Sequence, residues 1–220
     1  MAASWHGEVV VALEIAVIPV TPFQQNCALV WDGPSRQGAV FDPGGDVPQI
    51  EAAIAQAGVV VRDIFLTHGH IDHAGGAMLL AQALGVKITG PGAEDRFLLE
   101  GMAAQGRQFG LSAQNCTPDA WLMEGDEISV GGHGFEVLHC PGHTPGHMVF
   151  INRAAKFGIL GDVLFRNSIG RTDFEYGDTD ALINAIKTKL LPLPDDFAFI
   201  CGHGEASTIG AERRSNPFIR

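Results

Sequence analysis

The spacing of hydrophobic side chains changes along the chain and predicts both strands and helices. Residues 9–20 are rich in Val and Ile and alternate loosely with polar positions, which is typical of a strand. Residues 26–31 and 38–42 predict two more strands, because the turn sequence Asp-Gly-Pro lies between them. In residues 47–57 apolar side chains lie four positions apart, which indicates a helix with one buried face.

The ends of the predicted helices are marked by residues that favour caps. Asp46 stands just before the first helix and is a preferred N-cap residue, whereas Gly58 follows it and suits the left-handed conformation that ends helices. A second helix is predicted to end near Gly85. A third is predicted over residues 178–190, with Asp at its start and two Lys near its end, an order that suits the helix dipole.

Most of the remaining chain predicts buried strands with Gly-rich connections. Residues 59–66 form a nearly continuous apolar run, which is typical of a strand buried on both faces. Residues 91–111 are interpreted as one or two short helices in a mobile insertion. Further short strands are predicted over residues 127–130, 135–139, 148–151, 157–161 and 197–201.

The predicted order of elements is strands, helix, strand, helix, strands, helix, strand. The simplest way to bury their apolar faces is a sandwich of two sheets with helices on the outside, an α+β fold. The chain has 220 residues and contains neither an internal repeat nor a linker-like stretch, so we expect one domain over residues 1–220.

Composition and charge exclude several classes of protein. Hydrophobic residues make up 46% of the chain, which excludes disorder, and the net charge of −11 without a basic run argues against a nucleic-acid partner. The first basic residue is Arg36, and no apolar run approaches the ~20 residues that span a bilayer, so neither a signal peptide nor a membrane span is expected. The four Cys are scattered, which favours buried free thiols. We expect a cytoplasmic monomer or small homo-oligomer.

Three of the nine histidines fall within six residues, in the sequence His68-Gly69-His70-Ile71-Asp72-His73. Imidazole and carboxylate groups are the usual ligands of zinc and similar divalent metals. On a tight turn His68 and His70 point to the same side, whereas Asp72 and His73 begin the next element and point to a neighbouring position. One turn can therefore present ligands to two metal ions, and Gly69 lets the backbone come close.

Three more candidate ligands follow predicted strands further along the chain. His143 comes after an apolar strand, Asp162 ends another, and His203 stands between two Gly after the last. Polar side chains at strand ends can build a site on the rim of a sandwich. Taken singly, each of these residues is more often a turn former or a surface residue, but together with the cluster they predict a metal site.

In these positions the chain resembles the metallo-β-lactamase superfamily, and the resemblance covers nearly the whole sequence. It implies an αβ/βα sandwich with two metal ions held between the sheets. It assigns three residues to the first metal, three to the second and one to both: His68, His70 and His143, then Asp72, His73 and His203, and finally Asp162.

Within this superfamily the chain looks most like the type II glyoxalases, or hydroxyacylglutathione hydrolases, in a short form. The similarity lies in residues 19–27, 42–45, 170–174 and 212–217. It implies a thioesterase that cleaves S-D-lactoylglutathione or a related hydroxyacyl thioester with a metal-bridging hydroxide. We expect two zinc ions, with iron or manganese as alternatives. Asp72 is expected mainly as a ligand, and secondarily as the acceptor of a proton from the hydroxide.

The glutathione-binding residues of that family are only partly matched. Arg171 takes the place of a family Lys, whereas no Tyr matches the family tyrosines and the chain's only Tyr, Tyr176, lies further on. The chain ends soon after His203, so the helical C-terminal domain of longer relatives is expected to be absent. We expect Arg166 and Arg171 to contact an anionic substrate, with a surface ion pair as the alternative for each.

Each of the other side chains near the predicted site has two alternative roles, one functional and one structural. Residues 91–111 are a candidate wall of the cleft, with Phe97, Met102 and Phe109 as its apolar side chains and core packing as the alternative. His147 is a candidate to orient a metal ligand through a hydrogen bond, with a plain structural role as the alternative.

Three other activities share these ligand types. A persulfide dioxygenase also resembles the chain, and it would hold one iron with the residues matching His68, His143 and Asp162. A lactonase or a β-lactamase shares the metal motif but attacks a cyclic ester or amide. The complete second set of ligands favours a two-metal hydrolase, and the number and identity of bound metals would discriminate between these activities.

Overall fold

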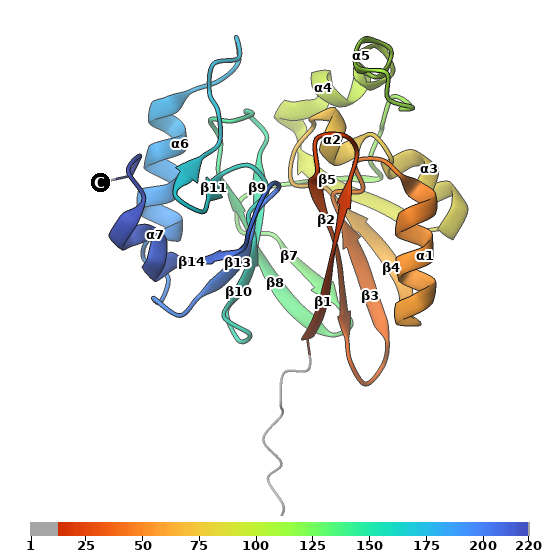
Figure 1. The fold of residues 1–220 in the computed structure, drawn as a ribbon, viewed down its shortest axis with the longest axis horizontal. Helices are drawn as coiled ribbons and strands as arrows, with labels where there is room; N and C mark the ends of the chain where they lie inside the picture. Colours follow the sequence, from red (N-terminus) through yellow and green to blue (C-terminus); the bar gives the residue numbers. More distant parts are fainter. Residues whose placement is uncertain (1–12, 220) are drawn as a thin grey trace, which may run out of the picture.

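The structure of the protein is a computed structural model that describes residues 13–219. Two six-stranded sheets pack against each other, and helices cover the outer face of each sheet (Figure 1). A third, two-stranded sheet is formed by β11 (Leu164–Phe165) and β12 (Ser168–Ile169). The sandwich with external helices that the sequence predicts is confirmed.

The first sheet joins antiparallel and parallel pairs. Its strands follow one another in chain order: β1 (Leu13–Val20), β2 (Gln25–Asp32), β3 (Gln37–Phe41), β4 (Val60–Phe65), β5 (Lys87–Gly92) and β6 (Ala120–Leu122). From β3 to β6 the neighbours are parallel, so each pair needs a crossover. The first two crossovers contain α1 (Val47–Ala57) and α3 (Ala77–Leu84). The carboxyl ends of these parallel strands therefore meet at one edge of the sheet.

The second sheet is mostly antiparallel. Its order is β14-β13-β10-β9-β8-β7, with the bounds β7 (Glu127–Val130), β8 (His133–His139), β9 (Met148–Asn152), β10 (Phe157–Ile159), β13 (Ala198–Ile200) and β14 (Ser207–Thr208). Only β10 and β13 are parallel neighbours within it. The connection between them contains α6 (Thr179–Ala185), which continues as a π-helix over Ile186–Leu190. Together with α7 (Ile209–Ser215), α6 covers the outer face of this sheet (Figure 1).

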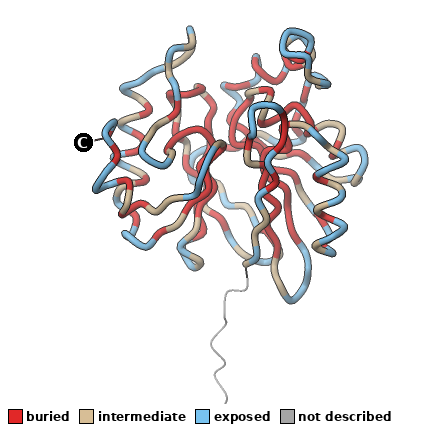
Figure 2. Tube along the Cα trace, viewed as in Figure 1, coloured by how far each residue is buried: buried red, intermediate tan, exposed pale blue. Residues whose placement is uncertain are grey.

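Three apolar layers hold the sandwich together. One lies between each sheet and its helices, and the third lies between the two sheets. The central layer is rich in buried aromatic rings; Phe41 of the first sheet and Phe150 of the second have ring centroids 5.1 Å apart. Figure 2 shows the buried chain concentrated in the two sheets and in the loops at their upper ends. Those loops carry the candidate ligands, so the site rests directly on the core.

The predicted helix ends are confirmed in three cases and wrong in one. Gly58 and Gly85 take positive φ angles of 63° and 67° at the ends of α1 and α3, and the Asp178 carboxylate caps α6 by accepting a hydrogen bond from the Ala181 amide at 2.9 Å. Asp46 does not cap α1 with its side chain.

The Asp46 carboxylate is used elsewhere because the residue adopts the left-handed conformation, with φ of 47°. It accepts a hydrogen bond from the Thr21 amide at 2.7 Å, which ties the turn after β1 to the start of α1. The part of the predicted strand over residues 9–12 lies outside the described residues. Strands β5 and β6 are additional to the prediction, since β5 ends in Gly-Pro-Gly, a sequence typical of turns.

The segment predicted as an insertion contains a 3₁₀ turn (Ala93–Asp95), α4 (Arg96–Glu100) and α5 (Met102–Phe109). Leu99 and Met102 are completely buried, so the base of this segment belongs to the core of the first sheet. None of the helices within residues 13–219 is long and apolar enough to cross a membrane. The four Cys are buried free thiols, as expected.

Candidate metal centre

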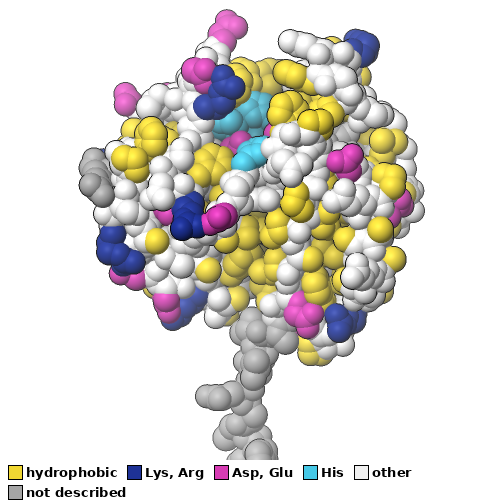
Figure 3. Space-filling model, in the orientation of Figure 1, with side chains coloured by type: hydrophobic (Ala, Val, Ile, Leu, Met, Phe, Trp, Pro, Cys, Tyr) yellow, Lys and Arg dark blue, Asp and Glu magenta, His cyan; other side chains and the backbone are white. Residues whose placement is uncertain are grey.

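Seven polar side chains converge at the upper edge of the sandwich, where strands of both sheets end. His68 and His70 lie in the loop after β4, Asp72 and His73 in α2 (Ile71–Ala74), His143 between β8 and β9, Asp162 after β10 and His203 after β13. Figure 3 shows histidine side chains in a hollow between the two halves of the molecule. All seven predicted ligands are thus brought to one place, from segments far apart in the sequence.

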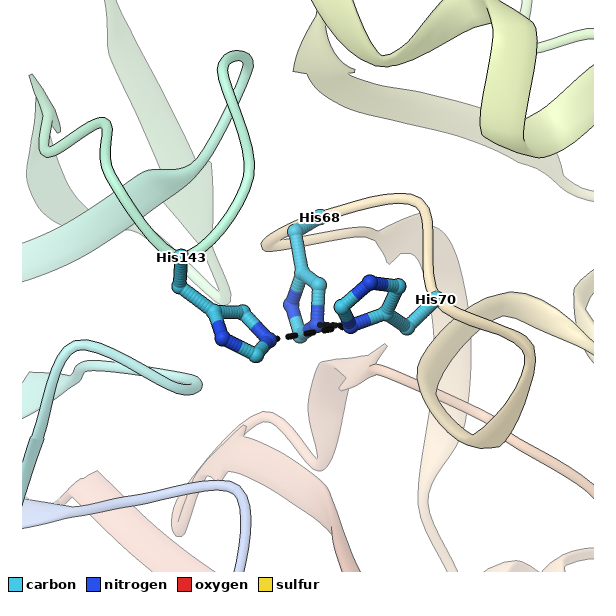
Figure 4. Close-up of side chains that lie close together, drawn as sticks. All are labelled: His68, His70 and His143. Carbon is cyan, nitrogen blue, oxygen red and sulfur yellow. Dashed lines mark hydrogen bonds between the residues drawn. The ribbon is translucent and has the colours of Figure 1, made fainter. Parts of the chain in front are cut away.

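Three imidazoles form the first group. His70 Nδ1 lies 3.1 Å from His68 Nε2 and 2.9 Å from His143 Nε2 (Figure 4). A hydrogen bond at either contact would require a hydrogen on one of these three nitrogens. Each neutral ring carries only one N–H, so a ring whose hydrogen is on its other nitrogen turns a lone pair toward the centre of the group.

Outward-facing nitrogens of two of these rings are held by acceptors. His143 Nδ1 donates to the carbonyl oxygen of Arg171 at 2.8 Å. The Thr67 hydroxyl donates its own hydrogen to the buried Asp42 carboxylate. It therefore accepts the hydrogen of His68 Nδ1, at 3.0 Å. A neutral imidazole carries one N–H, so the Nε2 atoms of both rings present lone pairs toward the centre of the group.

The third ring is held by the chain's only tyrosine. His70 Nε2 lies 2.8 Å from the Tyr176 hydroxyl, which leaves Nδ1 as the inward atom. Burial raises the pKa of Tyr176 to about 12, with a smaller contribution from Asp95, so the phenol keeps its hydrogen at neutral pH. In the tautomer with the His70 hydrogen on Nε2, where the Tyr176 oxygen accepts it, the first group presents three converging lone pairs, which is the arrangement that a metal cation needs.

The second group consists of Asp72, His73 and His203, and Asp162 lies between the two groups. His203 Nε2 is 3.2 Å from Asp72 Oδ2. One oxygen of Asp162 is 3.3 Å from His73 Nε2, and the other is 3.5 Å from His143 Nε2, which belongs to the first group. The Asp162 carboxylate therefore faces both groups at once.

Two buried atoms beside this group, His73 Nε2 and Asp162 Oδ1, have no hydrogen-bond partner among residues 13–219. His73 donates from Nδ1 to Asp42 at 2.9 Å, so Nε2 of the neutral ring carries a lone pair and faces Asp162 Oδ1, another lone-pair atom. His203 is held in the same way. Its Nδ1 donates to the carbonyl oxygen of Phe23 at 3.1 Å, so Nε2 of the neutral ring carries a lone pair. Buried polar atoms are nearly always paired, and lone pairs that face each other are paired by a cation. The residues present thus fit two divalent metal ions.

The pKa values of four of these side chains bear on that fit. Burial, aided by the neighbouring imidazoles, holds the pKa of His68 well below its usual range and lowers the pKa of His70 to about 3. Burial also opposes charge on Asp162, but the adjacent imidazoles, His73 first, outweigh it and lower the pKa of this carboxyl well below its usual range. Burial opposes charge on His73 as well, yet Asp162 and Asp42 raise its pKa, so this point attracts positive charge.

Asp42 is a functional residue that the sequence pattern did not single out. It accepts hydrogen bonds from His73 Nδ1 at 2.9 Å, from the Thr67 hydroxyl at 2.6 Å and from the Thr67 amide at 2.7 Å. Through Thr67 it also orients His68, so one buried carboxylate fixes a ring in each group. Asp42 belongs to the stretch 42–45 that carries the family resemblance and stands at the end of a predicted strand, but neither signal assigns it this role, because a turn-forming Asp shares the second.

Asp95 joins the two loops that carry the first group. Its carboxylate accepts hydrogen bonds from the Gly69 amide at 2.8 Å, from the Gly146 amide at 2.6 Å and from the Thr144 hydroxyl at 2.7 Å. Burial raises the pKa of Asp95 to about 6, although these three bonds oppose the rise. No local sequence feature points to this role, because both partner loops are distant in the chain.

His147 supports the centre without facing it. Its ring stacks on His68 with centroids 4.6 Å apart, and its Nε2 accepts a hydrogen bond from the Asp162 amide at 3.0 Å. Two Gly residues allow the close approach: a Cβ at Gly69 would lie 2.8 Å from the Leu98 Cβ, and one at Gly202 would lie 2.0 Å from Asp162 Oδ1. Of these, Gly69 was expected from the sequence.

A cleft of about 710 Å³ opens above the seven side chains, and its lining is mostly apolar. It is formed by Phe23, His70, Ile71, Asp72, Gln105, Phe109, His143, Asp162, Phe165, Ser168, Ile169, Arg171, Phe174, Tyr176, His203 and Gly204. An apolar cleft with a few convergent polar groups is typical of a small-molecule site.

Both arginines expected to contact substrate are engaged with carboxylates. Arg171 is the only Lys or Arg that lines the cleft among residues 13–219, and it forms two 2.7 Å hydrogen bonds to Asp173 while lying over the Phe174 ring. Arg166 pairs with Glu205 and does not line the cleft. A direct contact of either arginine with substrate stays a prediction.

The candidate wall residues divide between two roles. Phe109 lines the cleft and contacts Phe23 edge-on, with ring centroids 5.9 Å apart. Phe97 packs edge-on against Tyr176 with centroids 5.2 Å apart. Met102 is completely buried in the core instead. Residues 91–111 thus contribute to the wall directly through α5, whereas α4 supports it through the contact of Phe97 with Tyr176.

With this geometry in view, the chain can be assigned to a family. The family model for the metallo-beta-lactamase superfamily matches residues 20–203, a stretch that includes every one of the seven candidate ligands. The chain belongs to that superfamily. The resemblance noted from the sequence is therefore confirmed, and so is the fold that it implies.

Particular relatives are similar over almost the whole chain. Hydroxyacylglutathione hydrolase GloC from Haemophilus influenzae is 48% identical over 209 residues, which cover 94% of this chain and 98% of that protein. The crystal structure of BLEG-1 B3 metallo-beta-lactamase superposes with a TM-score of 0.86 at 32% identity, over 94% of this chain and 99% of that one. TTHA1623 in a di-iron-bound form superposes with a TM-score of 0.82 at 34% identity, over 92% and 99%.

Proposed function

We propose that this protein is a hydroxyacylglutathione hydrolase-like thioesterase that works with two divalent metal ions. The observation that carries the proposal is the pair of lone-pair groups joined by Asp162 at the floor of an apolar cleft. The 48% identity to GloC supports the substrate class, a small hydroxyacyl thioester.

The division of ligands follows the two groups. His68, His70 and His143 would hold one ion, Asp72, His73 and His203 would hold the other, and Asp162 would bind both. We propose zinc for both positions, since imidazole and carboxylate suit it well, although the same donors accept iron, the metal bound in TTHA1623.

When bound, two such ions supply a water of lowered pKa as the nucleophile and polarise the thioester carbonyl. The protein's own residues hold and orient the reacting groups. Asp72 lines the cleft, which supports a second role for its carboxylate as the acceptor of the proton lost by the attacking water. A departing thiol has a pKa near 8.5, so it leaves as a thiolate and needs no dedicated acid.

The cleft wall supports substrate binding through apolar contact. Phe109, Phe165 and Phe174 line the cleft and would exclude water from the acyl group. Because Arg171 is already paired with Asp173, the wall offers no unpaired cation among the described residues for the carboxylates of glutathione. We therefore propose that affinity for the thiol carrier is modest.

The experiment is steady-state hydrolysis of S-D-lactoylglutathione by zinc-loaded protein, with elemental analysis of the bound metal. Asp162→Asn should lower kcat/KM by about a thousandfold and reduce the zinc content below two per chain. Asp196→Asn is the matched control, because Asp196 is an exposed partner of Lys156 away from the cleft; it should leave both quantities unchanged.

Three outcomes would overturn the proposal. The first is no turnover of thioesters although two zinc ions are bound. The second is turnover of a β-lactam instead, the activity named for BLEG-1. The third is a single iron per chain with persulfide oxidation.

A further inference from the structure

The hydroxyl of Tyr176 stands between the metal centre and the cleft. It lies 2.8 Å from His70 Nε2, and the tyrosine ring is part of the cleft lining. Tyr176 lies in the loop between β12 and α6, so the fold of this loop brings its hydroxyl to His70.

The direction of the His70–Tyr176 hydrogen bond follows from the other nitrogen of the ring. His70 Nδ1 faces the Nε2 atoms of His68 and His143, and a ligand nitrogen at that point carries a lone pair. The ring hydrogen of His70 is then on Nε2, so His70 donates and the Tyr176 oxygen accepts. The hydrogen of the Tyr176 hydroxyl is not used in this contact.

That hydrogen has no other partner among residues 13–219, where the contact with His70 is the one hydrogen bond of this hydroxyl. The ring itself is fixed from two sides. Phe174 stacks on it with centroids 5.3 Å apart and planes 12° apart, and Phe97 contacts its face edge-on at 5.2 Å. The structure therefore holds a free hydrogen-bond donor at a defined point of the cleft, one imidazole ring away from a ligand nitrogen.

Other side-chain donors of the cleft lining already have partners; the Ser168 hydroxyl contacts the Ile169 carbonyl oxygen at 3.5 Å. Arg171 is bound in a bidentate pair with Asp173, and the Gln105 amide contacts the Leu98 carbonyl oxygen at 3.4 Å. In a 2-hydroxyacyl thioester the carbonyl oxygen is the atom drawn to the cations, and the 2-hydroxyl is the polar group beside it. The Tyr176 hydroxyl is a donor next to the first group, and the oxygen of that 2-hydroxyl can accept its hydrogen.

We propose that Tyr176 donates a hydrogen bond to the 2-hydroxyl oxygen of the acyl group and at the same time positions His70. This assignment rests on the proposed thioesterase function and makes Tyr176 the residue that selects 2-hydroxyacyl over plain acyl thioesters. It gives one side chain two separable effects, one on substrate choice and one on metal affinity.

The test compares S-D-lactoylglutathione with S-propionylglutathione, which lacks the 2-hydroxyl, in wild type and Tyr176→Phe. The variant keeps the ring and its stacking on Phe174 and loses only the hydroxyl. The lactoyl substrate should lose on the order of tenfold in kcat/KM and the propionyl substrate much less, because the hydroxyl serves only the first. Zinc affinity, measured by chelator competition without substrate, should fall about tenfold.

Phe97→Leu is the matched control. It removes a packing contact of the Tyr176 ring and leaves both hydrogen bonds of the hydroxyl available, so the ratio of the two substrates should stay at the wild-type value. An equal loss on both substrates in Tyr176→Phe would overturn the substrate contact, and an unchanged zinc affinity would overturn the positioning of His70. A wild-type enzyme that cleaves neither thioester would instead overturn the proposed function, and the specificity role with it.

Discussion

The floor and the wall of the cleft are built on different principles. The floor, meaning the seven candidate ligands, is set in buried loops, and its outward ring nitrogens are anchored by the protein's own acceptors. The wall, meaning Phe109, Arg171, Phe174 and Tyr176, is formed by aromatic rings and by the Arg171 guanidinium, whose charge is neutralised by Asp173. The floor therefore determines which metal-dependent chemistry the site can support, whereas the wall determines which substrates it can bind.

Removing metal should have the largest effect and tests whether the floor depends on cations. Binding at about a thousand times Kd stabilises the folded state by about 4 kcal/mol, which corresponds to a rise in Tm of roughly 8–16 °C for a chain of this size. We expect that difference between zinc-loaded and chelator-treated protein in calorimetry. Equal melting temperatures for the two samples would contradict the lone-pair geometry of the floor.

Asp42→Asn should have the next largest effect and tests whether the hydrogen bonds of Asp42 hold the candidate ligands in position for the metal. Asp42 accepts from His73 and from Thr67, so an amide there would turn one acceptor into a donor facing these groups. Loss of such an anchor typically lowers metal affinity 10–100-fold, to be measured by zinc competition with a chromogenic chelator. The exposed Asp180→Asn is the control, and a variant with wild-type zinc affinity would assign Asp42 a purely structural role.

Asp95 links the two loops that carry the first group of ligands, and its contribution to the free energy of unfolding depends on pH. Its pKa of about 6 in the folded protein exceeds the ordinary 3.8, so the folded state binds a proton that the unfolded state releases. Its contribution to stability therefore falls as pH rises from about 4 to about 6 and is constant above that. Unfolding in urea should show the difference in unfolding free energy between wild type and Asp95→Asn changing by about 3 kcal/mol across this window, and a pH-independent difference would contradict it.

Asp173→Asn should have the smallest effect and tests whether the Arg171 side chain of the wall can bind substrate once it is unpaired. The substitution frees the Arg171 guanidinium, which now forms two hydrogen bonds to Asp173, and leaves the floor untouched. We expect KM for glutathione thioesters to fall a few-fold, as for an exposed ion pair worth ~0.5–1 kcal/mol, with kcat unchanged. A rise in KM would mean that the pair itself contacts substrate.

The floor could be predicted from the sequence because its residues follow strands directly. Once His68 to His73, His143, Asp162 and His203 were assigned to strand ends, a sandwich brought those ends together, and the structure has them there. Asp42 and Asp95 could not be predicted in the same way, because each acts on residues about 25 to 51 positions away and looks locally like an ordinary turn residue. Tyr176 was missed for a related reason: its contact with His70 depends on how the loop before α6 folds over the cleft.

The origin of the ligands has a consequence for assembly. In each group two side chains come from the half of the chain that forms the first sheet, and one comes from the half that forms the second: His68 and His70 with His143, then Asp72 and His73 with His203. Neither half alone completes a tridentate pocket. We therefore expect tight metal uptake only after the two sheets dock, so that the rate at which refolding protein captures a metal ion would report this docking.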